Sequence, residues 1–293
     1  MKQLTLLGVP TSAGAFTPGQ EKAPAALREA GLLEALAQHG IETRDLGDSA
    51  VWRWRPDRDD PRAQNLDAVV RIARETAGRV EAALGDGPLL VLGGDCTIEL
   101  GTLAGHPDDV GLVYLDLHPD LNTPATVTEG TFDWMGMAHA LGVEGAAPEL
   151  VGAGPRTPLL RDDQLVFLGY GPGAARPFEL DQMVRRGLAG ITVDEVAADP
   201  EGAARRALDA LAGERLLVHF DVDVVDYNDA QLSEDAPRGD GLTLDAALRA
   251  LAVLCADERL SAVTVTELNP LHADEEGAEL SRFVDGLAGS LAG

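Results

Sequence analysis

Three residues of the kinds that bind metal ions alternate along one short stretch of the sequence: Asp116, His118 and Asp120. They follow the apolar run of residues 111–115, which is typical of a buried strand. Residues two apart on an extended chain point the same way, so these side chains are expected to gather where the strand ends. Carboxylate and imidazole groups are ligands for divalent transition metals. The stretch therefore predicts a metal site at a strand end.

A second stretch repeats this alternation later in the chain, with Asp221 and Asp223 after another apolar run. His219 points to the same side as Asp221 in a regular strand, where it either supports the ligands from behind or is simply a packed, hydrogen-bonded histidine. Two further strand ends carry Cys96 and Glu267. The candidate ligands are more than one ion needs, so we expect two ions, and a water held between paired cations is a nucleophile for hydrolysis.

Strands and helices alternate throughout the sequence, which predicts an α/β fold with a mostly parallel sheet covered on both faces. No linker or internal repeat interrupts the pattern, so we expect one domain over residues 1–293. The expected strands are residues 4–9, 41–46, 88–92, 110–115, 165–169, 190–193, 216–222 and 262–268. The expected helices are residues 24–39, 64–84, 97–104, 133–141, 177–186, 201–211, 243–254 and 278–291.

The composition restricts the partners of the protein. The chain has 23 basic and 49 acidic residues, a formal net charge of −26, which argues against binding to nucleic acid or to an anionic membrane. A small cationic or metal-chelating ligand fits this charge better. The two cysteines, Cys96 and Cys255, exclude a disulfide framework and suit a reducing compartment. The sequence contains no signal peptide and no apolar run of membrane-spanning length, so we expect a cytoplasmic protein.

Four motifs in this order identify a resemblance to the ureohydrolase superfamily of arginases, agmatinases and related guanidino-compound hydrolases. They are Gly-Gly-Asp-Cys ending at Cys96, Asp-x-His-x-Asp-x-Asn from Asp116 to Asn122, Phe-Asp-Val-Asp ending at Asp223, and Glu-Leu-Asn-Pro beginning at Glu267. They span most of the chain and together are highly specific. The resemblance implies a three-layer α/β/α fold with a binuclear metal site, most often manganese, at the carboxyl ends of a parallel sheet.

The resemblance also implies a role for each site residue. Asp116 and Asp221 would bridge the two ions, Cys96 and Asp120 would bind one of them, and His118 and Asp223 would bind the other. Asp120 would in addition orient the bridging hydroxide. Glu267 would pair with the guanidinium group of the substrate, and Asn122 would contribute to substrate binding. Relatives are often trimers or hexamers, so a homo-oligomer is a possible assembly.

Three departures from the family pattern bear on metal and substrate. Cys96 replaces the usual histidine, and because a thiolate is softer than imidazole it favours Zn²⁺ or Fe²⁺ over Mn²⁺. Met135 stands where arginases have a proton-shuttling histidine, and methionine carries no transferable proton. Residues 171–174 lack the aspartate that binds the substrate α-amino group in arginases.

A cysteine at this ligand position also resembles the hydroxyarginine hydrolase branch of the superfamily, which releases hydroxyurea and ornithine. The sequence therefore predicts a binuclear metallohydrolase acting on arginine, N-hydroxyarginine or a related guanidino compound. The alternative is a catalytically silent relative that binds a ligand or serves as a subunit, because Cys96 and Met135 both replace functional histidines.

Overall fold

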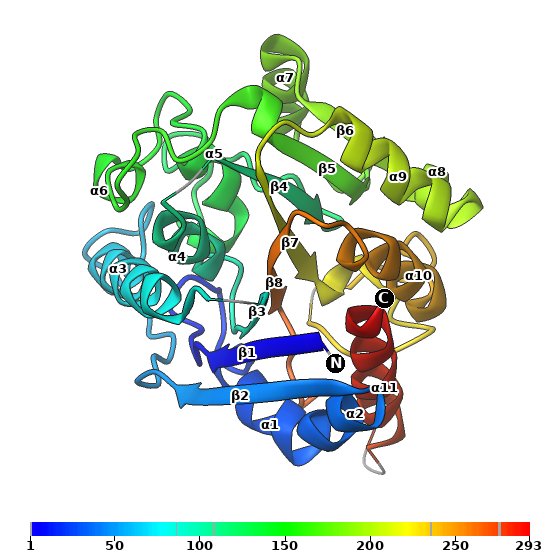
Figure 1. The fold of residues 1–293 in the computed structure, drawn as a ribbon. Coiled ribbons are helices and arrows are strands. Elements are labelled where there is room, and N and C mark those ends of the chain that lie inside the picture. The colour runs from blue at the N-terminus through cyan, green and yellow to red at the C-terminus, as the bar shows by residue number, and fades with distance from the viewer. Residues whose placement is uncertain (1, 86, 108, 235, 275–276) are drawn as a thin grey trace.

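The computed structural model describes residues 2–85, 87–107, 109–234, 236–274 and 277–293, and eight of its strands form a single parallel sheet (Figure 1). The strands lie in the order β2-β1-β3-β8-β7-β4-β5-β6. Their bounds are β1 Lys2–Gly8, β2 Ile41–Asp48, β3 Leu89–Leu92, β4 Val110–Leu115, β5 Leu165–Tyr170, β6 Ala189–Thr192, β7 Arg215–Asp221 and β8 Leu260–Thr266. Each expected strand is confirmed, with bounds that shift by up to two residues.

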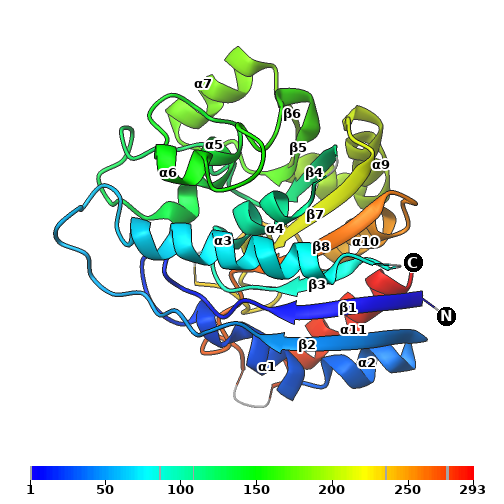
Figure 2. The same ribbon diagram turned by 60° about the vertical axis from the view of Figure 1, so that its left-hand side comes forward.

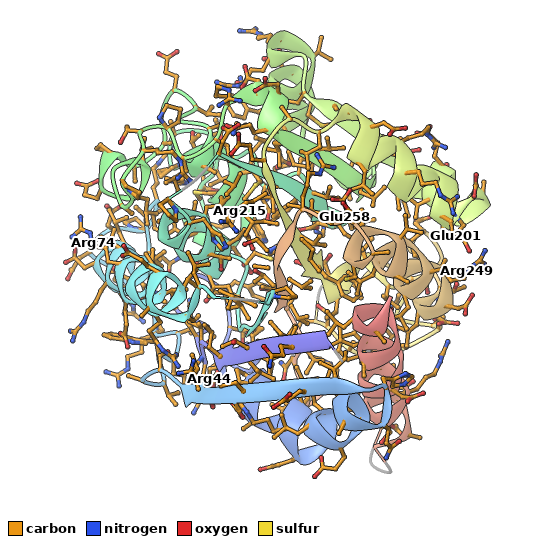
Figure 3. The ribbon with its side chains drawn as sticks, viewed as in Figure 1. Arg44, Arg74, Glu201, Arg215, Arg249 and Glu258 are labelled. Carbon is orange, nitrogen blue, oxygen red and sulfur yellow. The ribbon has the colours of Figure 1, made fainter. Side chains whose placement is uncertain are left out.

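Helices cover both faces of the sheet, so the predicted three-layer α/β/α fold is confirmed (Figures 1 and 2). The helices of one face are α3 Leu66–Ala83, α4 Ile98–Gly105, α5 Gly136–Ala140, α6 Pro148–Val151 and α7 Pro177–Arg186. Those of the other face are α1 Ala23–Glu29, α2 Leu32–Gln38, α8 Val193–Ala198, α9 Pro200–Ala210, α10 Leu244–Cys255 and α11 Ala278–Ala292. Glu201 and Arg249, labelled in Figure 3, join α9 to α10 by a 2.8 Å ion pair at the surface.

Strand β4 illustrates how the apolar runs produce two cores. Every residue of this strand is buried, and successive side chains point to opposite faces of the sheet. Val113 and Leu115 pack with α8 to α11, whereas Leu112 and Tyr114 pack with α3 to α6. The continuous apolar run in the sequence therefore reflects burial on both faces, as expected for a strand in the middle of a parallel sheet.

Two of the expected helices are wrong in detail. Residues 24–39 form two short helices, because Gly31 takes a left-handed conformation with φ of 90° between α1 and α2. Residues 133–141 form a 3-10 turn, η2 Phe132–Met135, followed by α5, because Met135 departs from helical backbone angles. The short helices α6 and α8 were not expected. The other helices are confirmed, and Thr243 caps α10 through a side-chain bond from the Ala246 N–H.

The strand order explains why distant motifs meet. Strands β3, β8, β7 and β4 are consecutive neighbours, and because all are parallel their carboxyl ends lie at the same edge of the sheet. Cys96 follows β3, Glu267 follows β8, Asp221 ends β7 and Asp116 follows β4. All four candidate strand ends therefore converge at this edge.

Among the described residues, no helix combines the length and apolar character needed to cross a bilayer.

Candidate metal centre

A tight backbone turn positions Cys96 at the end of β3. Gly94 lies so close to the main chain of Thr11 that an added Cβ would collide with its carbonyl oxygen. The next residue, Asp95, accepts hydrogen bonds from the Thr11 hydroxyl at 3.3 Å and from the Gly14 N–H at 3.0 Å. These contacts tie the turn to the loop after β1 and direct the Cys96 side chain towards the ends of β7 and β4.

The first group of potential ligands contains Cys96, Asp116, His219 and Asp221. One donor atom from each of these residues lies within 4.8 Å of all the others, and all four side chains are buried. The Cys96 thiol donates to Asp221 Oδ2 at 2.8 Å, and its sulfur lies 3.3 Å from His219 Nε2. A sulfur, a nitrogen and two carboxylates are a donor set that fits a divalent transition metal.

The second group contains Asp116, His118 and Asp223, again with donor atoms within 4.8 Å of one another. His118 Nδ1 lies 3.0 Å from Asp223 Oδ2 and 3.7 Å from Asp116 Oδ1. Asp116 therefore belongs to both groups and lies between them. This arrangement places two adjacent ligand sets at the ends of β4 and β7, with one carboxylate shared.

Asp120 and Asn122 are held differently from the other expected site residues. Asp120 lines the same pocket, but its Oδ2 accepts a 2.6 Å hydrogen bond from the Tyr114 hydroxyl, and it belongs to none of the ligand groups found among the described residues. Asn122 is buried beside Thr126, whose hydroxyl donates to its Oδ1 at 3.4 Å. It is not among the pocket-lining residues of the described chain.

Glu267 lies beside a carboxylate that the sequence interpretation missed, that of Asp133. The backbone N–H of Cys96 donates to Asp133 Oδ1 at 2.8 Å and to Glu267 Oε1 at 3.1 Å. Gln20 Nε2 donates to the other oxygen of Glu267 at 3.2 Å. Cys96, Asp133 and Glu267 form a third group of potential ligands. Two carboxyl groups that share one wall of a pocket suit a cation with several N–H donors, such as a guanidinium group.

The crowding of acids at this edge changes their protonation. Burial, and then the negative charge of neighbouring carboxylates, raises the pKa of Asp116, Asp221 and Glu267 well above the ordinary value. Burial and the charge of Asp95 raise the pKa of Asp133 to about 8. Burial alone would lower the pKa of His118, but the Asp223 carboxylate outweighs it and raises that pKa to about 10. The acidic cluster thus strongly favours bound cations.

Two orphaned oxygens indicate where cations fit. Asp116 Oδ2 and Asp223 Oδ1 are buried and have no hydrogen-bond partner in the described structure. Buried polar atoms are nearly always satisfied, and an unpaired carboxylate oxygen is especially costly. Both oxygens belong to the two adjacent ligand groups, so the residues present fit a pair of divalent ions.

Aromatic side chains narrow the pocket above these carboxylates. Phe16 and Trp134 belong to its lining, and their ring centroids lie 6.4 Å apart. The guanidinium of Arg176 lies over the Trp134 ring, 5.1 Å from its centroid. The pocket lining therefore combines acidic side chains with the aromatic rings of Phe16 and Trp134, and the Arg176 cation lies against the Trp134 ring.

The other two departures in the sequence lie away from this pocket. Met135 is fully buried in the core of α3 to α6. Residues 171–174 form a turn after β5 that lines a different cavity together with Leu117 and Val193. Neither segment contributes a lining residue to the metal pocket in the described structure.

Sequence reasoning missed Asp133 as a site residue and left the role of His219 open. The sequence predicts Asp133 only as the start of a helix, although an acidic residue in the segment between a ligand strand and the next helix is a usable signal. The sequence predicts Tyr114 as part of an apolar strand, because nothing in the local sequence places its hydroxyl against Asp120. These three contacts depend on which strands and loops are neighbours.

Comparisons with known proteins identify the family of this chain. The model of the arginase family matches residues 2–284. The arginase of Bacillus caldovelox is 30% identical over 304 aligned residues, covering 100% of this chain and 99% of that protein. Human arginase-1 is 27% identical, covering 92% of this chain and 85% of that protein.

Solved structures give the same result. The chain superposes on the arginase structure from Bacillus caldovelox with a TM-score of 0.87 and 27% identity, covering 100% of this chain and 99% of that one. The formimidoylglutamase structure from Bacillus subtilis has a TM-score of 0.75 at 18% identity, covering 100% of this chain and 86% of that one, a likeness of fold alone.

Proposed function

Because the chain belongs to the arginase family, we propose that it is a binuclear metal-dependent hydrolase that cleaves a carbon–nitrogen bond of a guanidino or related amidine compound. The observation that carries this proposal is the pair of adjacent ligand groups that share Asp116. Arginine, N-hydroxyarginine and related guanidino compounds are the candidate substrates.

The proposed ligands are Cys96, Asp116, His118, Asp120, Asp221 and Asp223. These residues would hold two divalent ions, which would supply an activated water as the nucleophile for hydrolysis of the carbon–nitrogen bond, with the amine as leaving group. Mn²⁺ is the metal expected from the family resemblance, whereas the sulfur of Cys96 favours Zn²⁺ or Fe²⁺. Asp120 has a second proposed role, which is to orient that water.

Glu267 is the proposed partner of the substrate cation, and Asp133 joins it. Their carboxyl groups accept from the same Cys96 N–H, so they face one position in the pocket. A guanidinium group has five N–H donors in a planar fork and can bond to both. Asn122 is also a proposed substrate-binding residue. It would act by holding the loop after β4, where it accepts from the Thr126 hydroxyl.

The pocket walls also support a proposal about the far end of the substrate. Trp134 offers an apolar surface, and Arg176 lies over that ring. A guanidino compound with a short aliphatic chain and a terminal carboxylate matches this order of acidic side chains, apolar ring and cation. A homo-oligomer, as in related trimers and hexamers, is part of the same proposal.

Metal analysis combined with a substrate panel tests the proposed function. The protein loaded with Mn²⁺, Zn²⁺ or Fe²⁺ is incubated with arginine, N-hydroxyarginine and shorter guanidino acids, and urea, hydroxyurea and ammonia are measured. We expect about two ions per chain and turnover of at least one compound, abolished in Asp221→Asn. Full metal occupancy without turnover on any compound would instead support the catalytically silent relative.

A further inference from the structure

His219 has three polar neighbours beside the metal pocket, and one of them is the sulfur of a pocket-lining residue. It lies on β7, fully buried, two residues before Asp221. Its Nε2 lies 3.3 Å from the sulfur of Cys96 and 3.1 Å from the Thr266 hydroxyl. Its Nδ1 lies 3.2 Å from Glu99 Oε2 on helix α4. Both ring nitrogens therefore have polar neighbours, and one of these neighbours is a candidate ligand.

Glu99 determines which ring nitrogen of His219 carries its lone pair towards Cys96 and the Thr266 hydroxyl. This glutamate is fully buried, and in the described structure its Oε1 has no hydrogen-bond partner. A carboxylate only accepts hydrogen bonds, so we assign the proton of the neutral ring to Nδ1. The lone pair of Nε2 then lies towards the Cys96 sulfur at 3.3 Å and the Thr266 hydroxyl at 3.1 Å, and a metal ion bound to Nε2 would replace that hydroxyl as its partner. A carboxylate behind an imidazole is the usual support of a metal-binding histidine.

Tyr114 holds the ring in this orientation. Its aromatic ring stacks on His219 with centroids 4.2 Å apart and an angle of 9° between the planes. The Tyr114 hydroxyl is itself anchored on Asp120 at 2.6 Å. The imidazole is thus fixed by a carboxylate at one edge and by an anchored ring on one face, so its Nε2 is preorganised.

We propose that the Nε2 atom of His219 binds the metal ion that Cys96, Asp116 and Asp221 also hold. Glu99 is the residue that orients the His219 ring. This inference rests on the metal centre of the proposed function. The four donor atoms lie within 4.8 Å of one another. A tetrahedral zinc with bonds of roughly 2.0–2.3 Å places its ligand atoms about 3.3–3.8 Å apart, so small side-chain shifts close this set on one ion. In this set His219 takes the ligand position proposed above for Asp120, whose Oδ2 accepts from the Tyr114 hydroxyl and which keeps its proposed role towards the water.

The consequence is a pair of chemically unlike sites. The ion at Cys96 and His219 has sulfur, nitrogen and oxygen donors and suits Zn²⁺ or Co²⁺. The ion at His118 and Asp223 has one nitrogen and carboxylate oxygens, which suit Mn²⁺ better. His219 would therefore supply an imidazole ligand to this ion, in place of the histidine that relatives have at the position of Cys96.

X-ray absorption on the wild-type protein loaded with two zinc ions tests the donor set without any mutation. The sulfur of Cys96 is expected at about 2.3 Å and imidazole nitrogen at about 2.0–2.1 Å. If His118 and His219 both bind, the spectrum contains two imidazoles for each sulfur. One imidazole for each sulfur would overturn the proposal.

Variants give a second measurement that does not use activity. His219→Gln and Glu99→Gln are loaded with Co²⁺, the thiolate-to-cobalt absorption is recorded, and zinc affinity is measured by chelator competition. We expect Glu99→Gln to lower affinity at one site by roughly 10–100-fold and His219→Gln to lower it further, with a changed cobalt spectrum. His106→Gln, which changes a buried histidine bonded to Ser261 on the same sheet, is the matched control.

These outcomes separate the inference from the proposed function. An unchanged cobalt spectrum and zinc affinity in His219→Gln, with the control folded, would overturn the role of His219 even in an active hydrolase. A spectrum that depends on His219 in a protein that hydrolyses no guanidino compound would support this inference and overturn the proposed function.

Discussion

The hydroxyl of Tyr114 donates a 2.6 Å hydrogen bond to Oδ2 of Asp120, and both side chains are buried. This bond links a strand residue in the core to a candidate ligand in the loop that follows the strand. Asp120 has a positive φ of 51°, a backbone conformation that non-glycine residues rarely adopt. The bond therefore helps to hold a strained loop in the position that the pocket requires.

Replacing Tyr114 with phenylalanine is expected to weaken this loop. The ring still stacks on His219, but Oδ2 of Asp120 loses its donor in a buried place. We expect the free energy of unfolding of the metal-free protein to fall by about 1–3 kcal/mol. Chemical denaturation measures this change, and Tyr170→Phe on β5 is the control. Equal stability of the Tyr114→Phe and wild-type proteins would contradict the importance of this bond.

Replacing Cys96 with histidine is expected to raise manganese occupancy. The substitution exchanges a soft sulfur donor for an imidazole, which Mn²⁺ accepts more readily. Elemental analysis after loading with equal Mn²⁺ and Zn²⁺ measures the ratio of the two metals. Cys255→Ala, which changes the cysteine of α10, should leave this ratio as in wild type. An unchanged ratio in Cys96→His would count against Cys96 as a ligand.

Replacing Asp133 with asparagine tests the paired carboxylates. The amide oxygen can still accept from the Cys96 N–H, so the loop should keep its fold. Kinetics are measured above pH 8, where the carboxyl group of Asp133 is ionised and the substitution removes one negative charge from the pocket. We expect KM for a cationic guanidino substrate to rise about 10–100-fold, the effect of losing a charge-assisted hydrogen bond. The metal content should stay near wild type. A KM within twofold of wild type would exclude Asp133 from substrate binding.

Replacing Arg176 with glutamine tests the far end of the substrate. Its guanidinium lies over the ring of the pocket-lining residue Trp134 and 3.7 Å from the Glu129 carboxylate, so a substrate carboxylate would bind it in exchange for Glu129. We expect kcat/KM to fall about tenfold for guanidino acids and to stay constant for matching guanidino compounds without the carboxylate. Arg185→Gln, an exposed arginine of α7 paired with Asp181, is the control. Equal decreases in kcat/KM for both substrate types would mean that Arg176 does not bind the substrate carboxylate.

His139 predicts a pH dependence of stability outside the metal pocket. It is fully buried, its Nδ1 contacts the Met135 carbonyl at 2.6 Å and its Nε2 accepts from the Ala147 N–H at 3.0 Å. Burial lowers its pKa from 6.5 to about 4. The unfolded chain therefore binds a proton more readily, and the stability present above pH 6.5 is lost as the pH falls towards 4.

The size of this effect follows from the pKa shift. It amounts to about 3 kcal/mol across that interval, as an order of magnitude. His139→Gln should be less stable than wild type at pH 7 but should lose less additional stability between pH 6.5 and 4. Denaturation midpoints of both proteins at equal metal loading measure the difference. Parallel pH profiles would show that His139 does not titrate in this way.

Local patterns in the sequence were sufficient for the strands, and they placed the motifs of the proposed ligands at strand ends. The alternation of Asp116, His118 and Asp120 after an apolar run depends only on the two-residue period of an extended chain. Strands such as β4 are buried on both faces, so their apolar character is continuous and unambiguous. The order of strand and helix then fixes a parallel, three-layer architecture.

The tertiary structure decided which of these residues are partners. Strands β3, β8, β7 and β4 lie side by side in the sheet, and no local sequence pattern predicts this order. It brings His219 against Cys96, and the loop after β4 folds back to place Asp133 beside Glu267. The break between α1 and α2 likewise depends on the left-handed backbone of Gly31. Such contacts join residues far apart in the chain, so the sequence alone indicated most of the candidate donors, whereas packing added Asp133 and decided how the donors are grouped.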